Sequence, residues 1–193
     1  MNLENKITGR FTIRDKNTSE IILEKTNAIH YENFGEALAL AAAGNAEGHI
    51  YEMHFGNGAS IIDSVGAISY YPPNVEGVNA NLYNPTYFKI VDQKSSANSN
   101  PTANFMEVKH TRGNLFTDII IVCTLDYGEP SGQDAFDLTN DLEGDFIFDE
   151  IGLKSFSSVA GAGKLLTHAI FSPIQKSLNR SYEIEYVIRI ATC

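Results

Sequence analysis

The chain has 193 residues, with 14 Lys and Arg against 24 Asp and Glu, a formal net charge of −10. This length fits one domain, which can bury roughly 70% of the surface that its unfolded chain exposes. The negative charge argues against a phosphate-binding surface, and therefore against nucleic acids and anionic membranes as partners. Eleven Phe and nine Tyr without any Trp favour a β-rich core.

The cysteines and the N-terminus indicate a protein of a reducing compartment. Cys123 lies in an apolar run and Cys193 is the last residue, too few cysteines for a disulfide scaffold. The opening MNLENKITGRF lacks the basic and apolar regions of a signal peptide. No run approaches the roughly 20 apolar residues of a membrane span. We expect a soluble protein with a buried thiol at Cys123.

The first quarter of the chain predicts a hairpin followed by a helix. Residues 6–15, KITGRFTIRD, alternate between two faces as a half-buried strand does, and IILEK at 21–25 returns after a polar turn. Asn33 resembles a helix N-cap, with Glu36 three residues further on as in a capping box. Ala and Leu then recur at helical spacing as far as Gly44, where we expect the helix to end.

The remainder predicts strands separated by loops. The expected strands are 49–56, 87–91, 104–110, 118–127, 145–155, 164–173 and 181–190. Alternate positions of the last strand should share one apolar face: Tyr182, Ile184, Tyr186, Ile188 and Ile190. Three segments predict long surface loops that carry assembly contacts, at about 70–87, 93–104 and 133–145. We expect one domain over residues 1–193, a mainly β antiparallel sandwich or open barrel with one α-helix near the N-terminus.

Asp149 and Glu150 stand side by side in FDEIGLKS and raise the question of a catalytic pair. Adjacent strand residues point to opposite faces, so these carboxylates cannot converge on one substrate by themselves. A glycosidase that uses one of them with Asp126 or Glu129 stays open as an alternative. We favour a structural role, in which one acid faces solvent or a neighbouring subunit and the other ties a strand end to a backbone or basic partner.

Other motifs give no catalytic or cofactor site. VAGAGKLL has Ser158 where a phosphate loop needs glycine, and its lysine opens a strand instead of a helix. The five histidines lack zinc spacing, and no nucleophile elbow occurs. The acidic segment with Asp134, Asp137 and Asp141 has the wrong phase for a calcium loop, although calcium stays open as an alternative. We expect no enzymatic activity, no cofactor and no metal.

Several short motifs, taken in order, resemble phage tail-collar fibre N-terminal domains and related small virion proteins. The motifs lie in ENFGEALALAAAG, IYEMHFGNGAS, ANLYNPTYFKI, FDEIGLKS and the segment from GKLLTHAIF to the last strand, within residues 33–190. The matching positions are Gly56, Asn57, Gly58, Leu82, Tyr87, Glu150, Ile151, Gly152, Leu153, Leu166, His168 and Lys176. A tail fibre continues into a long shaft and a receptor-binding tip, so we expect an attachment or assembly unit and not a whole fibre.

The resemblance implies a non-enzymatic virion protein of the tail, neck, baseplate or fibre-attachment region, synthesised in the host cytoplasm. Its partners would be other virion proteins and copies of itself, in a ring or trimer. In this interpretation Glu150, Gly152 and Leu153 form a structural signature. Gly152 allows close packing where the strand meets the helix, and Glu150 holds a neighbouring loop or subunit. The interface candidates, chosen because Tyr is enriched at hot spots and the loops are acidic, are Tyr70, Tyr71, Tyr83, Tyr87, Asp134, Asp137 and Asp141. A capsid decoration protein and a carbohydrate-binding module, with a glycan as partner, stay open as alternatives.

Overall fold

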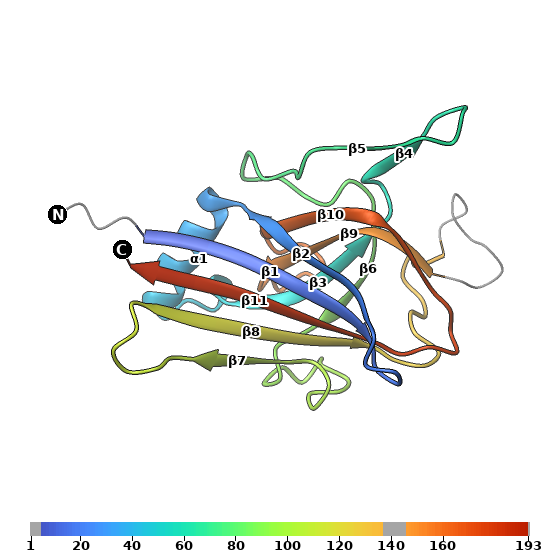
Figure 1. Ribbon diagram of the computed structural model, residues 1–193. Coiled ribbons are helices and arrows are strands. Elements are labelled where there is room, and N and C mark those ends of the chain that lie inside the picture. Colours follow the sequence, from blue (N-terminus) through green and yellow to red (C-terminus); the bar gives the residue numbers. More distant parts are fainter. Residues whose placement is uncertain (1–4, 137–145, 193) are drawn as a thin grey trace.

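The computed structural model, which describes residues 5–136 and 146–192, contains one large antiparallel sheet and one α-helix (Figure 1). The sheet has nine strands in the order β6-β3-β9-β10-β2-β1-β11-β8-β7. Their bounds are β1 Asn5–Asp15, β2 Ile21–Ile29, β3 Ile50–Gly56, β6 Pro85–Ile90, β7 Phe105–Lys109, β8 Phe116–Leu125, β9 Phe146–Ser155, β10 Leu165–Lys176 and β11 Tyr182–Thr192. The predicted mainly β fold with one helix near the N-terminus is confirmed. Because one sheet curls around the core, the fold is an open barrel.

Helix α1 (Tyr31–Ala42) is capped by a residue that the sequence analysis did not identify. The predicted N-cap, Asn33, is wrong: the N-cap is His30, three residues earlier, and the Nδ1 atom of His30 accepts the N–H of Asn33 at 3.2 Å. The side chain of Asn33 is buried and donates to the carbonyl of Leu165 at 2.9 Å. A short 3-10 helix, η1 (Ala46–Gly48), follows. Within the described ranges, no helix is long and apolar enough to cross a membrane.

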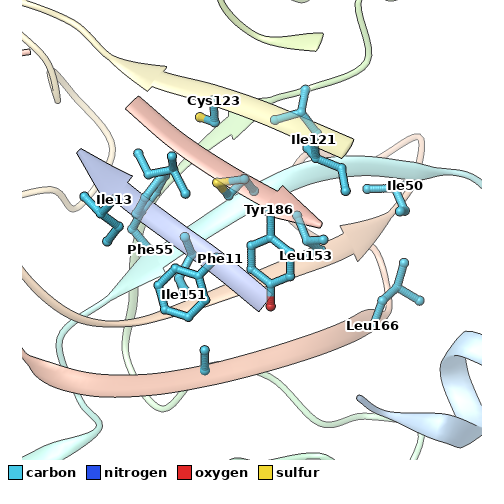
Figure 2. Close-up of a cluster of buried hydrophobic side chains, with 14 of the residues drawn as sticks. Phe11, Ile13, Ile50, Phe55, Ile121, Cys123, Ile151, Leu153, Leu166 and Tyr186 are labelled. Atoms are coloured by element: carbon cyan, nitrogen blue, oxygen red, sulfur yellow. The ribbon is translucent and has the colours of Figure 1, made fainter. Parts of the chain in front are cut away.

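The core fills the inside of the curled sheet (Figure 2). Phe11 of β1 lies 5.5 Å from Tyr186 of the neighbouring β11 and 5.6 Å from Phe171 of β10, measured between ring centroids, so aromatic contacts join strands across the core. The predicted apolar face of β11 is confirmed, since the first four of its five residues are fully or almost fully buried and Ile190 packs at the edge of the core. Cys123 is a free, buried thiol, and burial raises its pKa to about 12.

A small two-stranded element projects from the barrel. Strands β4 (Ser60–Ile62) and β5 (Ile68–Tyr70) pair with each other and not with the large sheet, and the hairpin that they form extends beyond the end of β10 (Figure 1). We call residues 60–70 the arm. Ile61, Val65 and Ile68 are exposed by 50%, 86% and 43%, so the arm carries apolar side chains that the described part of the chain leaves largely open to solvent.

Each outer edge of the large sheet is capped at one residue by a glutamine side chain. The amide of Gln133 accepts from the N–H of Phe88 in β6 at 2.9 Å and donates to its carbonyl at 3.0 Å. The amide of Gln93 makes the same pair of hydrogen bonds with Met106 in β7, each 2.9 Å long. Each amide thus replaces a neighbouring strand at one point of an edge that would otherwise invite strand pairing.

Candidate functional site

Glu150 in β9 accepts hydrogen bonds from three loop N–H groups and one imidazole. Its Oε1 accepts from the N–H groups of Gly58 at 3.3 Å and Asn84 at 2.8 Å, and its Oε2 accepts from that of Tyr83 at 2.9 Å. The Nε2 atom of His168 in β10 donates to Oε2 at 2.8 Å. Glu150 and His168 are both completely buried. The carboxylate therefore fixes two loops that are far apart in the sequence.

The tautomer of His168 follows from its two neighbours. The Nδ1 atom accepts the N–H of Asn74 at 2.8 Å, so the ring proton must be on Nε2, which donates to Glu150. His168 thus extends the network of Glu150 to a third point in the loop that follows the arm. His30 fastens the same loop, because its Nε2 lies 2.9 Å from the carbonyl of Gly77.

Asp149, next to Glu150, fixes the base of the arm. Its Oδ1 accepts the N–H of Ala59 at 3.1 Å and its Oδ2 accepts the hydroxyl of Ser60 at 2.5 Å. Burial raises the pKa of Asp149 more than these hydrogen bonds lower it. The expectation that one of the two acids faces solvent or a subunit is wrong: Asp149 and Glu150 are 2% and 0% exposed. Loops cover both faces of β9 at this point, so both acids bind the chain itself.

The glycine turn 56–58 is shaped by the carboxylate that it surrounds. A Cβ on Gly56 would lie 2.4 Å from Oε1 of Glu150, and a Cβ on Gly58 would lie 2.7 Å from the backbone nitrogen of Asn84. Gly152 is similarly confined, because a Cβ added to it would lie 2.8 Å from Cδ1 of Leu82 and 2.7 Å from the carbonyl oxygen of Thr167. Gly152 was predicted to allow packing against the helix, and this is wrong, because its close neighbours are β10 and the loop before β6.

We expect Gly56→Ala to lower the free energy of unfolding by about 2 kcal/mol, because the new methyl group must displace the Glu150 carboxylate. The matched control is Gly35→Ala in the middle of α1, where no atom lies within 4 Å of the added Cβ. That change should raise the free energy of unfolding by about 0.5–1 kcal/mol through helix propensity. Urea unfolding of both variants measures the difference, and equal effects would contradict the confinement of Gly56.

A second buried polar cluster holds the tip of the β9–β10 hairpin. Nε2 of His54 lies 2.9 Å from Oε2 of Glu52, whose Oε1 accepts the N–H of Gly161 at 3.1 Å. The ammonium of Lys154 donates to the carbonyl of Gly161 at 2.8 Å. Burial lowers the pKa of His54 and of Lys154. Lys154, His54 and Gly161 also line a surface depression of about 330 Å³.

A third cluster holds the loop after β8. Lys176 is completely buried, and its ammonium donates to the carbonyls of Asp126, at 2.9 Å, and of Glu129. Lys89 in β6 donates to the carboxylate of Glu129 at 2.5 Å and to the carbonyl of Thr124 at 2.8 Å. The carboxylate of Glu129 thus pairs with Lys89, whereas Lys176 contacts Asp126 through its backbone carbonyl. Burial lowers the pKa of Lys176 to about 8.

The predicted interface residues divide into three groups. Tyr70, Tyr71 and Tyr83 are exposed by 46%, 42% and 39%, and Asp134 is also exposed. Tyr87 is not an interface residue: it is 7% exposed in β6 and packs against the rings of Phe55 and Phe146, because the strand continues through it. Asp137 and Asp141 lie outside the described residues.

The chemistry open to these groups is limited by their burial. Glu150 and His168 lie at the distance of an acid–base pair, but a substrate would have to displace the backbone N–H groups that fill the carboxylate oxygens. No three His, Cys, Asp or Glu side chains in the described part of the chain are placed to hold a metal ion. The cluster around Asp149 and Glu150, which we call the carboxylate node, therefore orders the arm and the loop that follows it.

Comparison of the chain with protein-family models, with curated proteins and with solved structures finds no match in any of the three. The resemblance to tail-collar fibre domains therefore stays a prediction from the short motifs.

Proposed function

We propose that this protein is a non-enzymatic structural component of a tailed-phage virion, of the tail, neck, baseplate or fibre-attachment region. It acts through contacts that its arm and the loop after the arm make with neighbouring subunits. The observation that carries the proposal is that the motifs resembling tail-collar fibre domains meet at one place in the fold. Four separate segments of the chain meet at the carboxylate node. They contribute Glu150 itself and, around it, Gly58, Leu82 and His168.

A node of this kind serves a contact surface better than a catalytic site. All four oxygens of its buried carboxylates accept hydrogen bonds from the chain, and they order the segments that present apolar and aromatic side chains to solvent. Tyr71 and Tyr83 lie 4.9 Å apart between ring centroids, and the hydroxyl of Tyr83 donates to the carbonyl of Pro72 at 2.8 Å. Ordered, exposed aromatic rings lose little entropy on binding, which is why they anchor interfaces.

The test is whether the protein belongs to the particle. Phage particles from the source of this sequence are purified on a density gradient and washed at high salt. An antibody to the purified protein should then detect it in the particles, in a fixed ratio to the major coat protein. Cosedimentation with separated tails would support a tail or neck location, and cosedimentation with empty heads would support the alternative of a capsid decoration protein. Presence in the lysate but absence from washed particles would refute the proposal.

A further inference from the structure

Strands β2 and β10 pair over a short stretch and then separate. Their register contains only Thr167 opposite Ile29 and His168 opposite Ala28, although β2 extends back to Ile21 and β10 extends forward to Lys176. We call the space between them, beyond the pair of His168 and Ala28, the split. It lies inside the order of the sheet, so the glutamines that cover the outer edges do not cover it.

The backbone of β2 is directed into the split. The N–H of His30 donates to the carbonyl of Leu166 in β10 at 2.9 Å, and alternate residues of a strand direct their N–H and C=O groups to the same side. Thr26 and Glu24 therefore present theirs to the split. On the β10 side of the split, the carbonyl of Ile170 accepts a hydrogen bond from the ammonium of Lys25 at 2.7 Å, where a paired strand would supply a backbone N–H. This is an edge on which an added strand can pair.

The surroundings of the split indicate what such a strand should carry. A depression of about 200 Å³ opens there, and Lys25 is the only permanently charged residue among the described ones that line it. Beside it, Ile21 and Ile22 of β2 are exposed by 56% and 37%. A strand that fits this edge brings apolar side chains and one carboxylate for the ammonium of Lys25.

The arm of this same chain has that chemistry. Ile61 in β4 is exposed, and Asp63 follows β4 directly. The two hydrogen bonds that the carboxylate of Asp63 accepts, from the N–H groups of Val65 and Ala67 at 2.9 Å, both use its Oδ1 atom, which leaves Oδ2 for a cation. The arm is also uncovered and projects clear of the barrel, so another molecule can reach it (Figure 1).

The arm and the split are neighbours on one molecule, which sets the symmetry of the contact. The hydroxyl of Tyr70, at the end of the arm, lies 2.8 Å from that of Ser172 in β10, and Tyr70 and Tyr71 line the depression at the split. One twofold axis near this point therefore brings each arm to the split of the other copy. We infer that two copies associate about this axis, with β4 of each arm added to β2 of its partner and Asp63 paired with Lys25.

Sedimentation equilibrium of the full chain over a concentration series tests the inference. Wild type should reach twice the chain mass of 21.2 kDa. Ile61→Asp should raise the dissociation constant at least about tenfold, because a charge would be buried in the contact. The matched control is Val108→Asp on β7, also an exposed apolar residue, at 67%, but distant from the split in the strand order, and it should leave the constant within about twofold. A wild type that stays monomeric, or equal effects of the two variants, would overturn the inference.

A double-mutant cycle isolates the pairing of the two charges. Lys25→Met and Asp63→Asn each remove one charge, and Asn keeps an Oδ1 acceptor for the turn. Each should raise the dissociation constant about threefold to tenfold, and the double variant should be no weaker than the weaker single one. Multiplicative effects would refute the pairing. The inference shares with the proposed function only the arm as contact surface: a particle component that is monomeric in solution refutes the dimer alone, and a dimer absent from particles refutes the virion role alone.

Discussion

Glu150→Gln should lower the free energy of unfolding by about 3 kcal/mol, although it changes one oxygen to an NH₂ group. Each oxygen of Glu150 accepts two hydrogen bonds, so the NH₂ group faces two donors whichever way the amide is turned. A buried donor that loses its acceptor costs about 1–3 kcal/mol. A change of tautomer at His168 does not relieve the conflict, because its Nδ1 must accept the N–H of Asn74.

The control for this variant is Glu107→Gln on β7, whose side chain is about half exposed, and which should change the free energy of unfolding by less than about 0.5 kcal/mol. Chemical denaturation gives both values. Amide hydrogen exchange gives a local measure, since the N–H groups of Tyr83 and Asn84 should lose protection in Glu150→Gln. A loss below about 1 kcal/mol would show that Glu150 does not fix these loops.

The second large effect is a dependence of stability on alkaline pH through Lys176. Burial lowers its pKa from 10.5 to about 8, so between these values the unfolded chain binds more protons than the folded protein. Stability therefore rises with pH across this window: the full cost of the buried ammonium is present below pH 8 and disappears as pH rises through 10.5. A shift of this size corresponds to roughly 3 kcal/mol.

Comparison with Lys176→Met separates this effect from other groups that titrate at alkaline pH. Between pH 7 and 10.5, wild type should gain on the order of 2–3 kcal/mol of unfolding free energy relative to the variant. Lys164→Met serves as the control, because that lysine lies in an exposed ion pair with Glu36. A wild type that loses stability relative to Lys176→Met over the same interval would contradict the sign.

The strand pattern was predictable where one face of a strand meets the core. β1 and β11 alternate between apolar and polar residues, and their predicted bounds agree with the observed ones to within two residues. The arm was not predicted, because its two strands have three residues each and carry no periodic pattern. The cap of α1 was also missed, since His30 acts through a ring nitrogen, and the capping rule covers only Ser, Thr, Asp, Asn and Gly.

The carboxylate node was predictable as a structural signature but not in its contacts. Alternation implies that every second strand residue faces water, yet all seven residues of β3 are buried because loops cover its outer face. Buried charged residues of β3, β9 and β10 therefore bind loop carbonyls, loop N–H groups or neighbouring side chains instead of facing solvent. These residues are Glu52, Lys154 and Lys176. The only signal in the sequence is the presence of charged residues inside otherwise apolar strands.

The amides of Gln93 and Gln133 have a consequence for how far such a protein can assemble. Sheets whose edge strands are unpaired can pair edge to edge without limit. Copies held at high local density in a particle would be especially prone to such pairing. With Phe88 and Met106 each occupied by a side-chain amide, that growth is blocked at both ends of the strand order. If copies associate, they must then use specific surfaces, which favours assemblies of fixed size over fibrils.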